Sequence, residues 1–274
     1  MYTKFQRCFI LKKEGKQNGD FSCKKKGMGM TMKRKAVLIT GASRGIGLAC
    51  ARRFAKAGYF VFLNCRHSLC ELAQVRDLLH AGGTDCELVP GNVGNPQEVA
   101  AIFQKIEARC QGLDVLINNA GISYVGLLTD MTDTDWREIL DSNLSSVFYC
   151  SRAAIPFMVS QKQGKILNIS SMWGRVGASC EAAYSATKAG VNGLTMALAK
   201  ELAPSNIQVN AIACGIIDTA MNACFSEEEL SALKEEIPAG RLGTPEEVAE
   251  LAFTLAENHP YLTGQIIGLD GGYI

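Results

Sequence analysis

The chain has 274 residues, of which 47 % are hydrophobic and 20 % charged, and its formal net charge is +1. This length and composition fit one large buried core and exclude a chain that is disordered over most of its length. No apolar run reaches the ~18 residues that a membrane-spanning helix needs, so we expect no membrane partner.

The eleven cysteines are odd in number and include no C-x-x-C pair. This usage indicates free thiols in a reducing compartment, so we expect a cytoplasmic protein. The three histidines are scattered, so we expect no structural metal site.

The first 35 residues hold eleven Lys and Arg but only two acidic residues. Because the whole chain carries +1, the remainder carries about −8. We expect residues 1–32 to be a basic, disordered extension, with the native start near Met32. A transit peptide or a nucleic-acid-binding arm is the alternative, but the aromatic residues there are too few and irregular for nucleic acid. Residues 33–274 are expected to form one folded domain.

A short apolar run at residues 35–40 suits a buried parallel strand, and a helical pattern follows through Ala57. Between them lies T-G-A-S-R-G-I-G, with glycines at 41, 45 and 47. A glycine turn between a strand and a helix is the setting in which a dinucleotide pyrophosphate binds a helix N-terminus. The spacing differs from G-x-G-x-x-G, and a plain turn is the alternative.

The next predicted strand, residues 59–63, ends at Asn64 and Arg66 without the carboxylate that usually binds the ribose of NAD. Arg44 lies in the glycine turn. Two guanidinium groups without a carboxylate favour a 2′-phosphate and hence NADP. The alternative is that both arginines are solvated loop charges.

Strand and helix patterns then alternate along the chain. We expect helices at 69–81, 96–110 and 133–161, and strands at 86–89, 113–117, 165–169, 207–213 and 264–269. Asn143 lies inside the third of these helices, and another helix starts at Thr244. Residues 216–240 are polar and helix-prone and are expected to form a lid. The alternation predicts an α/β fold, a Rossmann-like doubly wound parallel sheet of about seven strands with helices on both faces.

A helix that begins near Glu181 carries Tyr184 and Lys188, four residues apart and therefore on one face. A nearby cation favours the phenolate, so we expect the pKa of Tyr184 to be lowered towards neutrality. Taken alone, the pair also fits an amphipathic Tyr beside a Lys whose stem packs on the surface.

Together these motifs resemble the short-chain dehydrogenase/reductase family over residues 33–274. The glycine turn, N-N-A-G at 118–121, Ser171 with Tyr184-x-x-x-Lys188, and the terminal D-G-G fall in the family's order. The resemblance implies a catalytic tetrad of Asn143, Ser171, Tyr184 and Lys188, with Ser170 as the alternative serine. In this tetrad Tyr184 protonates the carbonyl oxygen, Ser171 orients it, Lys188 lowers the phenol pKa and binds the ribose, and Asn143 holds a water. Cys214-Gly215 stands where Pro-Gly is usual.

The resemblance also implies an NADP(H) site. Its residues are Gly41, Ser43, Arg44, Gly45, Ile46, Gly47, Asn64, Arg66, Asn92, Val93, Asn119, Ala120, Gly121, Tyr184, Lys188, Gly215, Ile217 and Thr219.

Two named substrate groups remain open, and another small ketone or a sugar is the third alternative. The chain resembles 3-oxoacyl-[acyl-carrier-protein] reductases of fatty acid biosynthesis, and Lys162 stands where a contact to acyl carrier protein is expected, although Ser205 replaces the second basic residue. The stretch 170–181 instead resembles reductases of a 5-aminopentanone group on elongation factor P, where Glu181 could meet a substrate ammonium. A charge at the helix start is the alternative role of Glu181.

A non-catalytic NADP-binding regulatory protein is the alternative from another class, although the intact tetrad argues against it. The resemblance implies a homotetramer, or a homodimer, through the long helices at 136–158 and 182–202, whose apolar faces fit packing on the sheet equally well.

Overall fold

The computed structural model describes residues 34–110, 112–222 and 226–274. The expected basic extension, residues 1–32, lies outside these ranges. Residues 34–274 form one compact unit.

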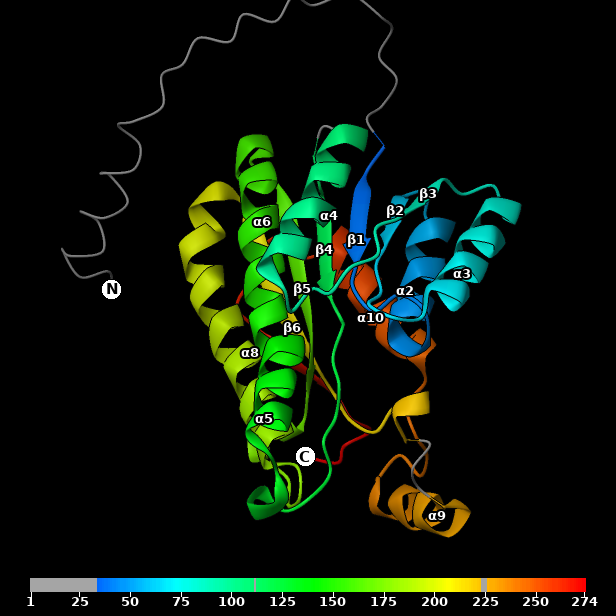
Figure 1. The fold of residues 1–274 in the computed structure, drawn as a ribbon, viewed down its shortest axis with the longest axis vertical. Coiled ribbons are helices and arrows are strands. Elements are labelled where there is room, and N and C mark those ends of the chain that lie inside the picture. The colour runs from blue at the N-terminus through cyan, green and yellow to red at the C-terminus, as the bar shows by residue number, and fades with distance from the viewer. Residues whose placement is uncertain (1–33, 111, 223–225) are drawn as a thin grey trace, which may run out of the picture. The chain divides into compact units, whose positions relative to one another are not determined.

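Seven parallel strands make a single sheet in the order β3-β2-β1-β4-β5-β6-β7 (Figure 1). The strands are β1 (Ala36–Ile39), β2 (Phe60–Leu63), β3 (Cys86–Leu88), β4 (Val115–Asn118), β5 (Gly164–Ser171), β6 (Ile207–Cys214) and β7 (Ile266–Leu269). The order runs outward in both directions from β1 and β4, which pair directly. The expected doubly wound parallel sheet is therefore confirmed.

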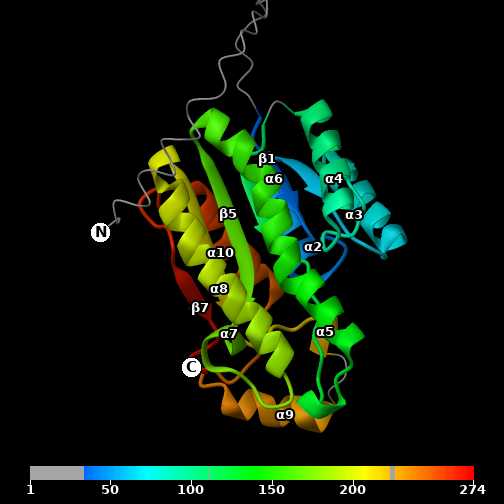
Figure 2. The same ribbon diagram turned by 60° about the vertical axis from the view of Figure 1, so that its left-hand side comes forward.

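Helices connect successive strands and cover both faces of the sheet (Figures 1 and 2). They are α2 (Gly45–Lys56), α3 (Leu69–Ala81), α4 (Pro96–Arg109), α5 (Asp133–Leu140), α6 (Ser146–Gln161), α7 (Trp173–Val176), α8 (Ala182–Leu202), α9 (Glu227–Glu236) and α10 (Pro245–Glu257). Within the described ranges, no helix is both long and apolar enough to cross a bilayer.

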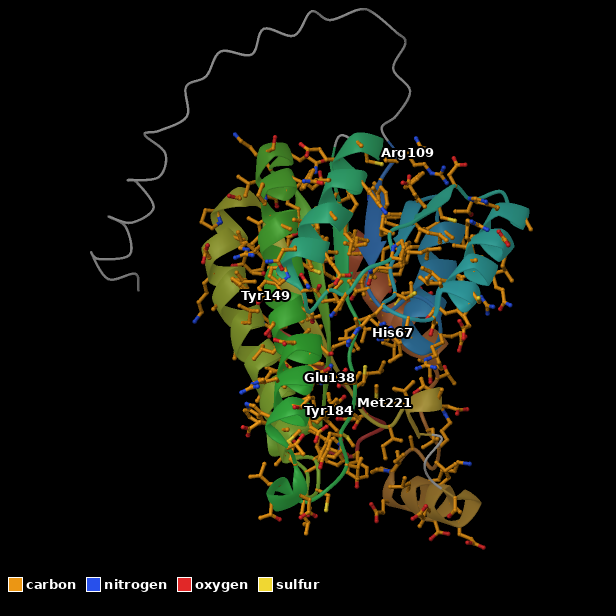
Figure 3. All side chains as sticks on the ribbon, in the orientation of Figure 1. His67, Arg109, Glu138, Tyr149, Tyr184 and Met221 are labelled. Atoms are coloured by element: carbon orange, nitrogen blue, oxygen red, sulfur yellow. The ribbon has the colours of Figure 1, made fainter. Side chains whose placement is uncertain are left out.

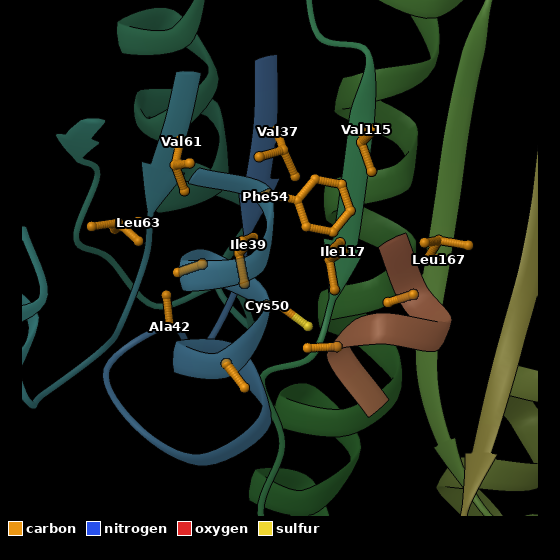
Figure 4. Close-up of a cluster of buried hydrophobic side chains, with 14 of the residues drawn as sticks. Val37, Ile39, Ala42, Cys50, Phe54, Val61, Leu63, Val115, Ile117 and Leu167 are labelled. Carbon is orange, nitrogen blue, oxygen red and sulfur yellow. The ribbon is translucent and has the colours of Figure 1, made fainter. Parts of the chain in front are cut away.

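Each face of the sheet has its own hydrophobic core, because side chains alternate along a strand. On β1, Val37 and Ile39 pack under α2, α3 and α10, whereas Ala36 and Leu38 pack under α4, α6 and α8. Figure 4 shows the first core, with Phe54 of α2 among the strand residues. Burial on both faces explains why strands such as β1 and β2 are continuous apolar runs.

Local signals fix where the helices begin. The Thr244 hydroxyl accepts from Glu247 N and the Glu247 carboxylate accepts from Thr244 N, so α10 starts with a capping box. Asn95 accepts from the backbone N–H groups of Gln97 and Glu98 at the start of α4. The polar segment 216–240 contains a short 3-10 turn (Ala220–Asn222) and α9.

Candidate functional site

A cleft of about 1110 Å³ opens at the carboxyl ends of the central strands, where ligands bind in open parallel sheets. It is lined by residues at or after the ends of β1, β2, β3, β4, β5 and β6 and by Leu233 of α9, among others. In Figure 3, His67, Glu138, Tyr184 and Met221 lie around this cleft, whereas Arg109 lies at the opposite end of the sheet. Every residue of the expected tetrad and cofactor set lines the cleft except Gly47 and Asn143.

The glycine turn after β1 has the geometry that a pyrophosphate requires. Gly41 and Gly45 have φ of +65° and +54°, which side-chain-bearing residues rarely adopt. A Cβ on Gly47 would lie 2.1 Å from the carbonyl oxygen of Gly41, so Gly47 allows helix α2 to pack against the turn. Helix α2 has no side-chain cap and no acidic residue in its first turn. Its N-terminus can therefore receive an anion, and the residues present fit a dinucleotide.

The loop after β2 carries the charged groups at one end of the cleft. Arg44, Arg66 and His67 all line it. Arg66 Nη1 lies 3.1 Å from Glu138 Oε1 of α5. Asn64 is buried and donates to the carbonyls of Val89 and Gly91, so its side chain holds the strand ends together.

The N-N-A-G segment after β4 is tied to the end of β1. Asn119 Nδ2 donates to the carbonyls of Thr40 at 2.9 Å and Gly41 at 3.1 Å. The Thr40 hydroxyl accepts from the backbone N–H groups of Asn119 and Ala120. These bonds fix the two central strand ends that form the floor of the cleft.

Asn143 lies in a π-helical turn (Asp141–Ser145) between α5 and α6. Its amide donates to the carbonyl of Ile122 and accepts from Ile122 N, both at 2.8 Å. A Cβ on Gly121 would lie 3.1 Å from Asn143 Oδ1 and 3.7 Å from Lys188 Nζ, so Gly121 allows these groups to approach the loop. Turns of this kind often occur at functional sites.

Ser171, Tyr184 and Lys188 meet where β5 ends and α8 passes over it. The Tyr184 hydroxyl forms a hydrogen bond with Ser171. Lys188 Nζ donates to the carbonyl of Ile169 at 2.9 Å and lies 5.5 Å from the centre of the Tyr184 ring. Ser170 differs from its neighbour, because its hydroxyl donates to Asn192 at 2.7 Å.

The expected lowering of the Tyr184 pKa is wrong for this structure. Burial raises the pKa of Tyr184, the hydrogen bond to Ser171 lowers it, and Cys214 and Glu181 raise it further. Lys188 is itself fully buried, and burial lowers its pKa to about 8. Its ammonium is directed to a backbone carbonyl, so the desolvation of the phenol outweighs the cation.

Glu181 lies at the start of α8, but its side chain caps no backbone N–H of that helix. Its carboxylate accepts from the hydroxyl of Ser123 at 3.2 Å and from the side chain of Trp173. Burial raises the pKa of Glu181, and these two hydrogen bonds partly oppose the shift. All three residues line the cleft.

The sequence patterns do not identify several lining residues. Trp173 lies on the short helix α7, and Ser123 follows N-N-A-G by two residues. The S-S-M-W run at the carboxyl end of β5 is a signal for Trp173, because residues at the carboxyl end of a parallel strand face the ligand crevice. Cys214 also lines the cleft, and burial raises the pKa of its thiol to about 12.

Lys162 is not beside the cleft of its own chain. It caps the C-terminal end of α6 and precedes β5, whereas the cleft lies where β5 ends. Within a single chain, the expected contact of Lys162 to acyl carrier protein would therefore lie away from the cleft, because the two ends of an eight-residue strand are far apart.

Comparisons with known proteins agree with this architecture. A family model described as short chain dehydrogenase matches residues 35–230. The 3-oxoacyl-[acyl-carrier-protein] reductase FabG of Staphylococcus aureus is 40 % identical over 239 residues, which cover 87 % of this chain and 97 % of that protein. The protein of the same name from Aquifex aeolicus is 39 % identical over 246 residues, 89 % of this chain and 99 % of its own length. A crystal structure of a candidate gluconate dehydrogenase from Agrobacterium tumefaciens superposes with a TM-score of 0.84 at 34 % identity, over 88 % of this chain and 96 % of that one.

Proposed function

The chain belongs to the short chain dehydrogenase family and is an oxidoreductase acting on CH–OH or C=O groups, and we propose that it is an NADPH-dependent ketone reductase similar to the 3-oxoacyl-[acyl-carrier-protein] reductases. The hydrogen-bonded pair of Tyr184 and Ser171, in the cleft that also contains the glycine turn, carries this proposal. It brings a proton donor, an orienting hydroxyl and a phosphate-binding turn into one site.

The chain's own residues would hold the cofactor at two places. The N-terminus of α2 and the glycine turn would bind the pyrophosphate. Arg44 and Arg66 would bind the 2′-phosphate, since the cleft offers two guanidinium groups at the end where NAD-binding proteins carry a carboxylate. When bound, NADPH supplies a hydride to the carbonyl carbon and leaves as NADP⁺.

Tyr184 would donate the proton that the carbonyl oxygen needs as it gains negative charge. Its raised pKa keeps the phenol protonated at neutral pH, which suits a proton donor in reduction. The Ser171 hydroxyl would orient the same oxygen, because it already shares a hydrogen bond with Tyr184. Lys188 would bind the ribose hydroxyls and return a proton to Tyr184 after the reaction. Its pKa of about 8 suits proton exchange near neutrality. Asn143 would hold the loop at Ile122 and a water beside Lys188.

The proposed role in fatty acid biosynthesis rests on similarity to reductases whose names specify a 3-oxoacyl-[acyl-carrier-protein] substrate. Apolar side chains at the cleft mouth are compatible with an acyl chain, since Val125 is 62 % exposed and Met221 50 %. For Lys162 to bind acyl carrier protein, it would have to lie beside the cleft entrance of a neighbouring copy of the chain. A homotetramer, or a homodimer, would provide one, and α5, α6 and α8 expose Trp136, Phe148 and Met196 for such contacts. We expect the enzyme to act in the cytoplasm.

A second candidate is reduction of a 5-aminopentanone group on a lysine of elongation factor P. Glu181 favours it, because a carboxylate in the cleft could bind the amine of such a substrate. A non-catalytic NADP-binding regulatory protein is the remaining alternative, and the assembled site argues against it.

The test measures NADPH consumption by the full chain with an acetoacetyl thioester and, in parallel, with elongation factor P that bears the aminopentanone. Turnover of the thioester alone supports the fatty-acid role, and turnover of the modified protein alone supports the second candidate. NADPH binding without turnover of these or of simple ketones would overturn the reductase proposal and favour the regulatory alternative.

A further inference from the structure

We propose that Glu181, held by Ser123 and Trp173, forms a subsite for a protonated amine or similar cationic hydrogen-bond donor on the ketone substrate. This inference rests on the proposed reductase function and specifies the class of ketone that the same cleft prefers.

The Glu181 carboxylate does not make the contact that a glutamate at a helix start normally makes. It caps no backbone N–H of α8. The ion pairs among the described residues do not include it. Two neutral donors, Ser123 from the loop after β4 and Trp173 from α7, hold it from outside its own helix. A contribution to helix stability therefore does not explain its position.

The charges that line the cleft are divided between its two ends. The described charged residues of the lining are Arg44, Arg66, Glu138, Glu181 and Lys188. Arg44, Arg66 and Glu138 lie at the end assigned to the cofactor, and Lys188 bonds to the carbonyl of Ile169. Glu181 is thus the charged side chain that remains for the substrate. A partly desolvated carboxylate without a cation is unfavourable, and a substrate cation would relieve that cost.

Glu181 is also close enough to the reacting groups to bind the same molecule. It lies three residues before Tyr184, one helical turn away, and its charge acts on the Tyr184 hydroxyl. A ketone whose oxygen lies between Tyr184 and Ser171 can therefore extend an arm to Glu181. Ile122 and Val125 line the cleft on either side of Ser123 and suit the methylene groups of that arm. A substrate with a carboxylate or phosphate on the arm would be repelled.

The experiment compares pairs of ketones that differ in charge but not in shape. One series ends in a dimethylammonium group, and the other ends in the isosteric isopropyl group, with arms of increasing length. The tertiary amine cannot condense with its own carbonyl. For each pair, kcat/KM is measured by NADPH consumption with the full chain. We expect the ammonium ketone to be preferred by about tenfold or more at the best arm length, the effect of one charge-assisted hydrogen bond.

Glu181→Gln should reduce the ratio of kcat/KM for the ammonium ketone to kcat/KM for the isopropyl ketone to near unity. The ratio is taken within each variant, so a general loss of activity does not affect it. Glu250→Gln is the matched control, because Glu250 pairs with Arg53 and is absent from the cleft lining, and it should keep the wild-type ratio. A wild-type enzyme that reduces both ketones equally would overturn the subsite while leaving the reductase proposal intact, and so would an unchanged ratio in Glu181→Gln. No turnover of either series would instead count against the reductase itself.

If Glu181→Gln does not fold, Ser123→Ala and Trp173→Phe provide the second test. Each removes one hydrogen bond to the carboxylate and should lower the preference for the ammonium ketone part of the way. A preference unchanged in both variants would contradict the proposal.

Discussion

Arg66 and Glu138 form an ion pair of 3.1 Å that joins the loop after β2 to helix α5, and both side chains line the cleft. Both are substantially exposed, at 41 % and 51 %, so the pair itself stabilises the fold little. It instead places a carboxylate on the guanidinium that we assign to the 2′-phosphate. Under this proposed assignment, Glu138 would compete with NADPH for Arg66.

Glu138→Gln should tighten NADPH binding by about two- to fivefold, the range of an exposed ion pair, and leave NADH binding nearly unchanged. The measurement is the dissociation constant of each cofactor by fluorescence titration at constant salt. Weaker NADPH binding in this variant would mean that Glu138 positions Arg66 rather than competes for it.

Arg66→Ala combined with Arg44→Ala should have the opposite effect. Loss of both guanidinium groups should weaken NADPH binding by about 10- to 100-fold, because hydrogen bonds to charged groups are the strong ones. NADH lacks the 2′-phosphate and should lose much less. An equal loss for both cofactors would show that the arginines act on a feature common to the two.

Tyr184→Phe should lower kcat by about 10²- to 10⁴-fold, the usual contribution of a proton donor, while NADPH still binds. Only the hydroxyl and its bond to Ser171 are removed. Lys188→Ala should reduce both turnover and NADPH affinity, because the ammonium is assigned to the ribose and to proton exchange. Stopped-flow turnover and cofactor titration on the two variants separate these effects, and poor NADPH binding by Tyr184→Phe would contradict its role.

Most of the fold could be predicted from the sequence because the strands are buried on both faces and the helices carry local start signals. Helix α3 was expected at 69–81 and is found at Leu69–Ala81, and a helix start was expected at Thr244, which is the N-cap of α10. The contacts of Asn143 could not be predicted, since its side chain bonds to Ile122, which is distant in sequence.

The site was harder to predict than the fold. Sequence spacing correctly indicated that Tyr184 and Lys188 share a helix. The direction in which the pKa of Tyr184 shifts depends on burial, which the spacing does not reveal. Likewise, Glu181 looks like a helix-start charge in the sequence, and only the positions of Ser123 and Trp173 reveal that its carboxylate faces the cleft.

The raised pKa of Tyr184 predicts a pH dependence for the reverse reaction, alcohol oxidation. Burial is the largest cause of the shift, and the Glu181 charge adds to it. Oxidation needs the phenolate, so its rate should rise with pH as Tyr184 ionises, whereas reduction uses the protonated form. Glu181→Gln removes one cause of the raised pKa, and the rising limb of the oxidation profile should move to lower pH. If the rising limb of the oxidation profile does not move in this variant, the ionisation of a group other than Tyr184 controls it.

Tyr273, near the C-terminus, links α9 to the substrate end of the cleft. Its hydroxyl donates to the carboxylate of Glu236, the last residue of α9, at 2.8 Å. Its ring packs edge-on against the ring of Trp173, with 5.8 Å between the ring centroids. The backbone N–H of Ala239 also donates to the carbonyl of Gly271, so the C-terminal residues hold the segment that follows α9. Figures 1 and 2 show α9 beyond the ends of the strands.

Tyr273→Phe should therefore raise the KM for the ketone by about two- to tenfold, the effect of one neutral or weakly charge-assisted hydrogen bond, with little change in the KM for NADPH. The physical reason is that Leu233 of α9 lines the cleft, and α9 loses a bond that fixes its position. Deletion of the last two residues also removes the ring contact to Trp173 and should raise the ketone KM further. Tyr261→Phe is the control, because Tyr261 is fully exposed and should have no effect. Steady-state kinetics with each substrate varied in turn makes the comparison, and an equal rise in both KM values would mean that Tyr273 acts on the fold as a whole.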